Sequence, residues 1–212
     1  MNTYLFDFDG TLVDSMPDYV GVMLRILDEH NIKYEKSIVK VITPLGYVGT
    51  AKYFHEKMGL DRPEAEIIEL MHKYAADAYH NRIMLKLSVA DVLRELKKRG
   101  ASLNVLTASP HDMLDPCLKR CGVFELFDNV WSCEDFGTTK SDPKIYEMAA
   151  ERMGCTVGEA LFLDDNPDAD RTAKSAGMPV CGVYDESSAQ YEAEMRELCD
   201  FYIKDFAELL KI

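Results

Sequence analysis

Two carboxylates one residue apart follow an apolar run close to the start of the chain. Asp7 and Asp9 stand after Tyr4-Leu5-Phe6. Residues two apart share one face of a strand, so a strand that runs to about Asp9 places both carboxylates on the same side, roughly 6 to 7 Å apart. Two like charges at that spacing repel each other unless a cation lies between them. An isolated pair of this kind also fits a solvated strand end that begins a turn, so its meaning depends on the rest of the chain.

Three further polar clusters follow apolar segments of strand length. A hydroxyl cluster, Thr107-Ala108-Ser109, follows the first of these segments, Lys140 lies beyond the second, and a pair of acids, Asp164 and Asp165, follows the third. Carboxylate oxygens suit Mg²⁺ where room remains for water and a phosphate oxygen. Hydroxyls, free N–H groups at a helix start and a Lys suit a phosphate. The clusters together predict a divalent cation beside an anion.

The segments that carry these clusters alternate between strand and helix patterns. After the first strand, further strands are predicted at residues 102–106, 130–131, 160–163 and 179–183, with helices between them. Such alternation is typical of an α/β fold with a parallel sheet covered on both faces. In that architecture ligands bind outside the carboxyl ends of the strands. We therefore expect the clusters to meet at one edge of the sheet.

Residues 15–83 interrupt this alternation because they contain helix patterns only. A helix is predicted to start after Ser15 in a capping box, a loop is expected at residues 44–49, and a second helix start at Asp61. The shift predicts an all-helical domain, residues 15–83, inserted into a discontinuous core of residues 1–14 and 84–212. The two linkers, near residues 13–15 and 83–88, are expected to act as hinges for opening of the inserted domain.

The four motifs resemble those of the haloacid dehalogenase superfamily, and the resemblance extends over nearly all of the chain. The segment Asp7-Phe8-Asp9-Gly10-Thr11 is similar to the first motif of that superfamily. Thr107 resembles the second motif, Lys140 the third and Asp164-Asp165 the fourth. The inserted helices resemble the cap of the subgroup that contains phosphoglycolate phosphatase and beta-phosphoglucomutase. The resemblance implies a Rossmann-like doubly wound core with a helical cap, Mg²⁺ dependence and chemistry through an aspartyl phosphate.

The same resemblance assigns roles to the motif residues. Asp7 is implied as the nucleophile, and Asp9 as the general acid that protonates the leaving oxygen and then as the base that activates water. The metal is implied to be held by Asp7, the main-chain carbonyl of Asp9 and Asp165, with Asp164 close by. Lys140 is implied to restrain Asp7. Five residues are implied to bind the phosphoryl oxygens: Gly10, Thr107, Ala108, Ser109 and Lys140. Two of them, Thr107 and Lys140, are also implied to be catalytic.

Two positions help to separate the activities found in the superfamily. The acid at Asp9 favours a phosphatase or a phosphomutase, because dehalogenases and phosphonatases do not keep an Asp there. Beta-phosphoglucomutases commonly carry a cap His where this chain has Tyr19, which weakens the mutase alternative. We predict a Mg²⁺-dependent phosphatase that acts on a small phosphorylated metabolite. The alternatives are a phosphomutase and a non-catalytic protein that binds a ligand or partner.

A few other residues compete with these assignments or extend them. Lys144 competes with Lys140 for the third motif, although it lies one turn into a predicted helix. Asp168 and Asp170 are expected to face solvent or a helix N-terminus, where acids are favourable. Tyr47, in the expected loop of the helical domain, is the side chain to test for contact with substrate, although a plain connecting loop fits equally well.

The composition restricts the partners. The chain has 212 residues and a net charge of −13, which argues against a nucleic-acid or anionic-membrane surface because those partners need a basic face. The six Cys lack the spacing and His partners of a zinc site, which favours thiols in a reducing compartment. No signal peptide or membrane span is expected, so a cytoplasmic location is predicted. Oligomeric state has no signal in the sequence.

Overall fold

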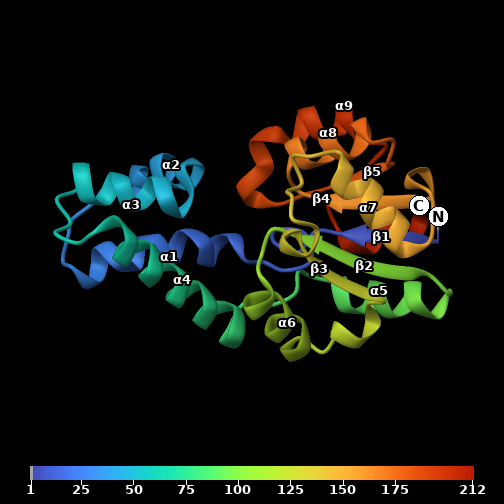
Figure 1. The fold of residues 1–212 in the computed structure, drawn as a ribbon, viewed down its shortest axis with the longest axis horizontal. Helices are drawn as coiled ribbons and strands as arrows, with labels where there is room; N and C mark the ends of the chain where they lie inside the picture. Colours follow the sequence, from blue (N-terminus) through green and yellow to red (C-terminus); the bar gives the residue numbers. More distant parts are fainter. Residues whose placement is uncertain (1) are drawn as a thin grey trace. The chain divides into compact units, whose positions relative to one another are not determined.

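The computed structural model describes residues 2–212, which fold into two compact units. One unit combines the residues up to Asp14 with Met84–Ile212, and the other is Ser15–Ile83. Figure 1 shows that all the strands belong to the first unit, while the second is built of helices. None of the described helices is both long enough and apolar enough to cross a membrane.

The first unit is built on a parallel sheet in the order β3-β2-β1-β4-β5-β6. This arrangement confirms the predicted Rossmann-like α/β fold, in which the chain moves outward from β1 first on one side and then on the other. The sequence pattern missed β6, which has only three residues and lies at the sheet edge. The strands are β1 (Thr3–Phe6), β2 (Ser102–Thr107), β3 (Asn129–Ser132), β4 (Ala160–Asp164), β5 (Val180–Val183) and β6 (Phe201–Ile203).

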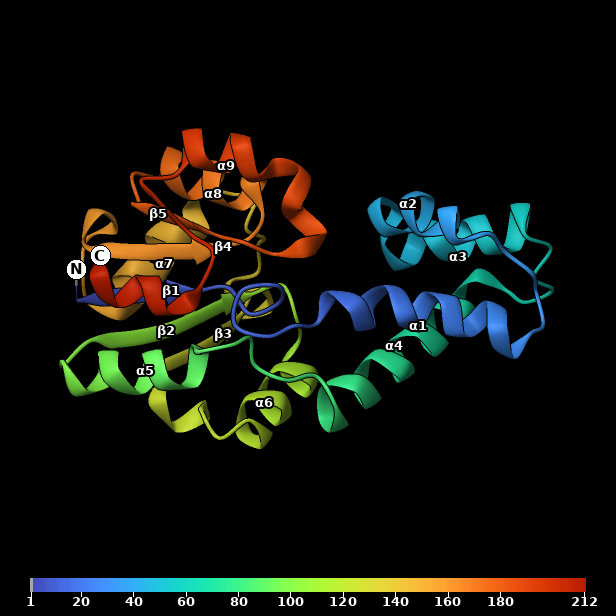
Figure 2. The ribbon, with the colours of Figure 1, turned by 180° about the vertical axis from the view of Figure 1, so that it is seen from behind.

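Helices cover both faces of this sheet, as the opposite views in Figures 1 and 2 show. Leu5 faces the side where Tyr146 of α7 stacks edge-on against Phe162, with ring centroids 5.1 Å apart. Phe6 faces the other side and packs 6.0 Å from the ring of Phe206 in the C-terminal segment. The helices of this unit are α5 (Val89–Lys98), α6 (His111–Arg120), α7 (Lys144–Met153), α8 (Pro167–Ser175) and α9 (Glu192–Leu198), and its 3-10 turns are η3 (Phe124–Leu126), η4 (Cys133–Phe136), η5 (Val157–Glu159), η6 (Glu186–Tyr191) and η7 (Phe206–Lys211).

The second unit packs α4 against both α1 and α3. The loop predicted at residues 44–49 is wrong, because α3 already begins at Gly46. Its buried residues Thr50, Ala51 and Phe54 favour the helix by packing, which overrides the weak helix preference of the two Gly. The predicted side-chain cap from Ser15 is also absent. The elements are α1 (Met16–Glu29), η1 (Lys36–Ile38), α2 (Val39–Ile42), η2 (Thr43–Leu45), α3 (Gly46–Lys57) and α4 (Glu64–Asn81).

The first strand ends earlier than the sequence suggested. β1 stops at Phe6, and the chain then enters a tight loop in which the N–H groups of residues 12 and 13 both donate to the carbonyl of Phe8. Gly10 adopts a positive φ of 73°, a conformation that favours glycine. Asp7 and Asp9 therefore lie beyond the strand, and the expectation that the strand pleat sets their common direction is wrong.

Candidate active site

The site residues gather where the strand order reverses. β1 lies between β2 and β4, so the carboxyl ends of these three parallel strands are neighbours. Asp7 follows β1 directly, Thr107 is the last residue of β2, and Asp164 is the last residue of β4. The N–H of Asp7 donates to the carbonyl of Leu163 at 2.8 Å, which fixes the first acid beside the end of β4. Parallel strand ends at such a switch point are where ligands bind in this architecture.

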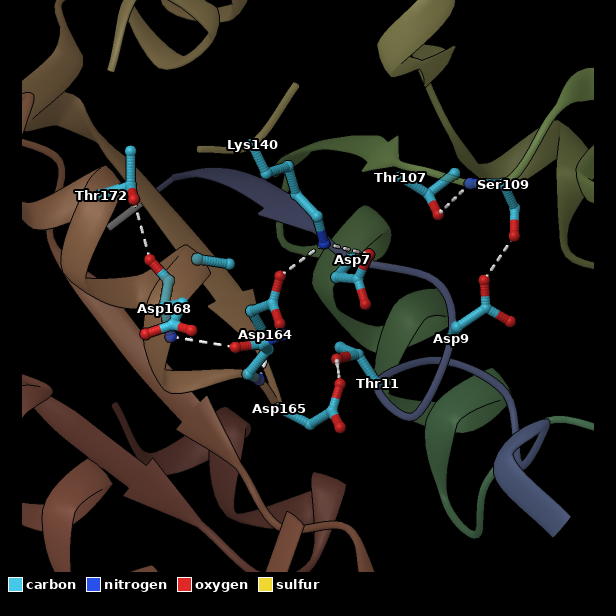
Figure 3. Close-up of polar contacts among 12 residues, drawn as sticks. Asp7, Asp9, Thr11, Thr107, Ser109, Lys140, Asp164, Asp165, Asp168 and Thr172 are labelled. Carbon is cyan, nitrogen blue, oxygen red and sulfur yellow. Dashed lines mark hydrogen bonds and ion pairs between the residues drawn. The ribbon is translucent and has the colours of Figure 1, made fainter. Parts of the chain in front are cut away.

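Three buried carboxylates form the centre of the site. Asp7, Asp164 and Asp165 each place a carboxylate oxygen within 4.8 Å of the others. Figure 3 shows them facing one another, with Lys140 above Asp7 and Asp164. The carboxylate of Asp9 turns elsewhere and accepts a hydrogen bond from the hydroxyl of Ser109 at 2.6 Å. The structure thus brings three of the four predicted acids into one cluster and holds the fourth against the turn after β2.

Lys140 joins two of these acids. Its ammonium Nζ lies 2.6 Å from Asp7 Oδ1 and 2.7 Å from Asp164 Oδ2, and its side chain is only 16% exposed. The phenol of Tyr146 donates to the main-chain carbonyl of Lys140 at 3.2 Å, which helps fix the loop before α7. Lys144, the competing candidate, is exposed at the start of α7.

The electrostatics of the cluster show an excess of negative charge. Burial raises the pKa of Asp7; the Lys140 ammonium opposes this rise, whereas Asp164 and Asp9 add to it. Burial also raises the pKa of Asp165 well above its usual range, with further contributions from Asp164 and Asp7. Burial alone lowers the pKa of Lys140, but the two adjacent carboxylates outweigh it and raise that pKa. One ammonium therefore faces three acids, and oxygen ligands with uncompensated charge suit a divalent cation.

The predicted phosphate-binding turn after β2 is organised by internal hydrogen bonds. The hydroxyl of Thr107 accepts from the N–H of Ser109 at 3.1 Å and is buried. Ala108 lies between these residues. Because the hydroxyl of Ser109 donates to Asp9, this side chain orients an acid in the structure. Figure 3 shows Thr107 and Lys140 on the same side of the cluster as Asp7.

Gly10 packs against the carboxylate of Asp165 with no space for a side chain. A Cβ atom at this position would lie 2.7 Å from Asp165 Cγ and Oδ2, so only glycine leaves room for that carboxylate. The next residue, Thr11, is buried and directs its hydroxyl toward Asp165 Oδ1 at 3.5 Å. The loop after β1 therefore shapes the position of the acid that follows β4.

The sequence interpretation missed some residues near the site. Asp170 is fully buried, so the expectation that it faces solvent is wrong, although it lies in the first turn of α8 as the helix N-terminus alternative expected. The thiol of Cys199 donates to Asp170 Oδ2 at 3.1 Å, and Oδ1 has no hydrogen-bond partner among the described residues. Lys86 and Asp185 also lie next to the loop after β1 through contacts across the sequence. Sequence spacing does not reveal such contacts. The one signal in the sequence is a charged side chain within an apolar segment, as at Lys86.

Comparison with known proteins agrees with this arrangement. The family model of haloacid dehalogenase-like hydrolases matches residues 1–177, which include all the clusters described above. The chain belongs to this family.

The chain is similar in sequence to several phosphatases and similar in fold to solved structures. Pyrophosphatase PpaX of Bacillus velezensis is 29% identical over 180 residues, which cover 84% of this chain and 81% of that protein. A phosphoglycolate phosphatase of Mannheimia succiniciproducens is 28% identical over 217 residues, which cover 98% of this chain and 96% of that protein. The crystal structure of CbbY from Rhodobacter sphaeroides in complex with phosphate shares the fold, with a TM-score of 0.78, 21% identity and coverage of 99% and 96%. The predicted superfamily is confirmed: the chain is a haloacid dehalogenase-like hydrolase, and the relatives named above are a pyrophosphatase and a phosphatase.

Proposed function

We propose that the protein is a Mg²⁺-dependent phosphatase that cleaves a small phosphorylated metabolite through an aspartyl phosphate on Asp7. The carrying observation is the buried cluster in which Asp7, Asp164 and Asp165 lie within 4.8 Å of one another with a single ammonium among them. A separate acid, Asp9, is held nearby by Ser109. Asp7 is thereby assigned as the nucleophile and Asp9 as the proton donor, while the carboxylates of Asp7 and Asp165 contribute to the cation site.

The cation site fits Mg²⁺ because its donors are hard oxygens with unbalanced charge. Asp7, Asp165 and the main-chain carbonyl of Asp9 would hold the ion. Asp164 accepts from Lys140 with one oxygen and from the N–H of Asn166 at 2.8 Å with the other, so we assign it chiefly to holding the ammonium. When bound, Mg²⁺ supplies positive charge against the carboxylates and the phosphoryl group.

In the first step a carboxylate oxygen of Asp7 attacks phosphorus, and the bond to the leaving oxygen breaks with its electron pair. Asp9 gives its proton to that oxygen, and the alcohol or phosphate leaving group departs. Lys140, 2.6 Å from Asp7, stabilises the ionised nucleophile against the burial that raises its pKa. Lys140 and the turn at Thr107 would hold the phosphoryl oxygens, because positioning and charge neutralisation dominate phosphoryl transfer.

In the second step water attacks the phosphorus of the aspartyl phosphate. Asp9, now ionised, takes a proton from that water, and the carboxylate of Asp7 leaves with the electron pair. The acid returns to its starting protonation state, and inorganic phosphate is released. The hydrogen bond from Ser109 to Asp9 keeps the same carboxylate available for both proton transfers.

The remainder of the substrate is proposed to be selected by residues 15–83 as a cap. Within that unit the rings of Tyr19 and Tyr47 stack with centroids 5.1 Å apart, and His72 packs edge-on against Tyr47 at 5.5 Å. The named relatives act on pyrophosphate and phosphoglycolate, so small anionic phosphate esters and anhydrides are the first class to screen. Tyr47→Ala is expected to change the ranking of kcat/KM among substrates more than it changes kcat for an aryl phosphate.

The proposal is tested by phosphate release from p-nitrophenyl phosphate with Mg²⁺. Asp7→Asn is expected to abolish turnover, and a chelator is expected to stop the wild-type enzyme until Mg²⁺ is restored. Asp168→Asn is the matched control. Asp168 lies four residues after the end of β4, as part of the same acidic segment as Asp164, but its side chain is 87% exposed. Wild-type turnover by Asp7→Asn, or by the chelated enzyme, would contradict the proposal.

The phosphomutase alternative is tested with the same preparation. NMR of a hexose 1-phosphate incubated with the enzyme is expected to show free phosphate. Formation of the 6-phosphate without free phosphate would assign the protein to the mutases instead.

A further inference from the structure

Lys86 uses all of its side-chain hydrogen-bonding capacity inside the first unit. Its ammonium donates to the carbonyl of Gly10 at 2.7 Å and to the carbonyl of Tyr184 at 2.6 Å, and it forms an ion pair with Asp185 Oδ2 at 3.1 Å. The side chains of Lys86 and Asp185 are 20% and 6% exposed. An ammonium has three N–H donors, so these three acceptors leave none for a substrate.

One end of this connection is the loop that carries Asp9. Besides its side-chain bond to Gly10, Lys86 donates its main-chain N–H to the carbonyl of Leu12 at 2.9 Å. Leu85, just before it, forms an antiparallel bridge with Val13. The loop after β1 is therefore held at two points by the same residue.

The other end is the segment after β5. The second oxygen of Asp185 accepts from the N–H of Ser187 at 2.9 Å and from its hydroxyl at 2.6 Å, so the carboxylate that pairs with Lys86 is itself fixed at the start of η6.

The sheet order gives this connection its significance. β4 lies between β1 and β5, so a residue that joins the loop after β1 to the segment after β5 spans the end of β4. That end carries Asp164 and, directly after it, Asp165. Gly10, the residue that Lys86 holds, is also the residue that packs directly against the Asp165 carboxylate.

We propose that Lys86 is a positioning residue of the active site, which fixes Gly10 against Asp165 and holds Asp9 in place by joining Gly10 to Asp185 across the end of β4. The inference rests on the proposed function, in which Asp9 moves protons and Asp165 holds Mg²⁺. Lys86 acts through these residues and touches no substrate. The position belongs to the second linker, three residues after the helical unit ends at Ile83.

Lys86→Met removes the ammonium while keeping the apolar stem. A shift of about 1 Å in a reacting group can cost roughly 100-fold in rate, so kcat is expected to fall by about 10-fold to 100-fold. KM for an aryl phosphate is expected to stay within about threefold, because no donor of Lys86 is free for substrate. Lys86→Arg keeps the charge and is expected to recover part of kcat. Lys97→Met, which breaks the ion pair to Asp128 in the same unit, is the control and is expected to retain wild-type kinetics.

Two measurements do not depend on catalysis. Calorimetric titration with Mg²⁺ alone is expected to show weaker binding in Lys86→Met than in Lys97→Met. Hydrogen exchange by mass spectrometry is expected to show faster exchange of the peptide covering residues 8–14, with core peptides unchanged. These readouts test Lys86 even if the wild-type protein hydrolyses no phosphate ester, a result that would refute the proposed function alone.

The double variant Lys86→Met with Asp185→Asn separates positioning from charge. If Lys86 positions Gly10, the double variant stays impaired in kcat and in Mg²⁺ binding. Recovery in the double variant would overturn the proposal, because it would show that the ammonium serves only to neutralise Asp185. Wild-type kcat, Mg²⁺ affinity and exchange in Lys86→Met would overturn it as well, and so would a loss confined to KM.

Discussion

Replacing Gly10 by Ala tests whether the loop after β1 sets the position of Asp165. The added Cβ would lie 2.7 Å from Asp165 Cγ and Oδ2, whereas ordinary contacts begin at 3.4 Å. The carboxylate of Asp165 must therefore shift by roughly 0.7 Å, the difference between these two distances. The shift falls on the carboxylate because the closely packed backbone of the loop cannot easily move away from it. The φ of 73° adds about 1 to 2 kcal/mol of backbone strain for a residue with a side chain.

These two effects have different readouts. The backbone strain lowers the free energy of unfolding and is expected to lower Tm by about 2 to 4 °C for each kcal/mol in a chain of this size. The displaced carboxylate is expected to lower kcat/KM by about 100-fold at fixed Mg²⁺, because a misplacement near 1 Å has that order of effect. The assays are thermal unfolding and p-nitrophenyl phosphate hydrolysis over a Mg²⁺ titration.

Gly154→Ala is the matched control. Gly154, at the end of α7, has nearly the same φ, 72°, but a Cβ added there would meet nothing within 4 Å. The variant is expected to lose similar stability while keeping wild-type kcat/KM and Mg²⁺ dependence. Equal activity of the two variants would refute the reasoning, because it would show that the contact between Gly10 and Asp165 does not matter for the reaction.

Three further predictions concern individual side chains. Ser109→Ala removes the hydrogen bond that orients Asp9, worth about 0.5 to 1.5 kcal/mol between neutral groups, and is expected to lower kcat more for an alkyl phosphate than for p-nitrophenyl phosphate, whose leaving group needs little protonation. Hydrogen bonds to Asp115 and, second, to Asp135 raise the pKa of His111. The contribution of the protonated imidazole to the stability of the fold is therefore complete below about pH 6.5 and is lost as pH rises through the raised pKa. Tm of the wild type is expected to fall relative to that of His111→Gln between about pH 6 and pH 8. Burial, and after it the charge of Asp164, raises the pKa of Asp170. Ionisation of this acid therefore lowers the free energy of unfolding as pH rises above about 4, and Asp170→Asn is expected to flatten the decline of Tm with pH. An unchanged slope would contradict the burial argument.

The parts of the site that follow from strand ends could be predicted from sequence. Parallel strands bring their carboxyl ends to one edge, so the alternation of apolar segments and polar clusters was enough to place Asp7, Thr107 and Asp164 together. The same pattern predicted the Rossmann-like sheet. It needed no knowledge of side-chain contacts, because topology alone decides which ends are neighbours.

The parts that depend on packing between distant segments could not be predicted. Gly46 and Gly49 suggested a loop, but burial of Phe54 and its neighbours outweighs their helix preference. Asp170 has the local pattern of an exposed acid in a helix start, and only the fold shows that it is enclosed. Lys86 contacts residues 76, 98 and 99 positions away, and no periodicity in the sequence encodes such distances.

Covalent catalysis by this protein requires that the carboxylate of Asp7 becomes phosphorylated during turnover. A rapid acid quench of the enzyme with a radiolabelled phosphate ester and Mg²⁺, followed by peptide mapping, measures that event directly. Label is expected on the peptide that contains Asp7, released by hydroxylamine and absent in Asp7→Asn. Turnover without labelled enzyme, or label on another residue, would contradict the proposed mechanism.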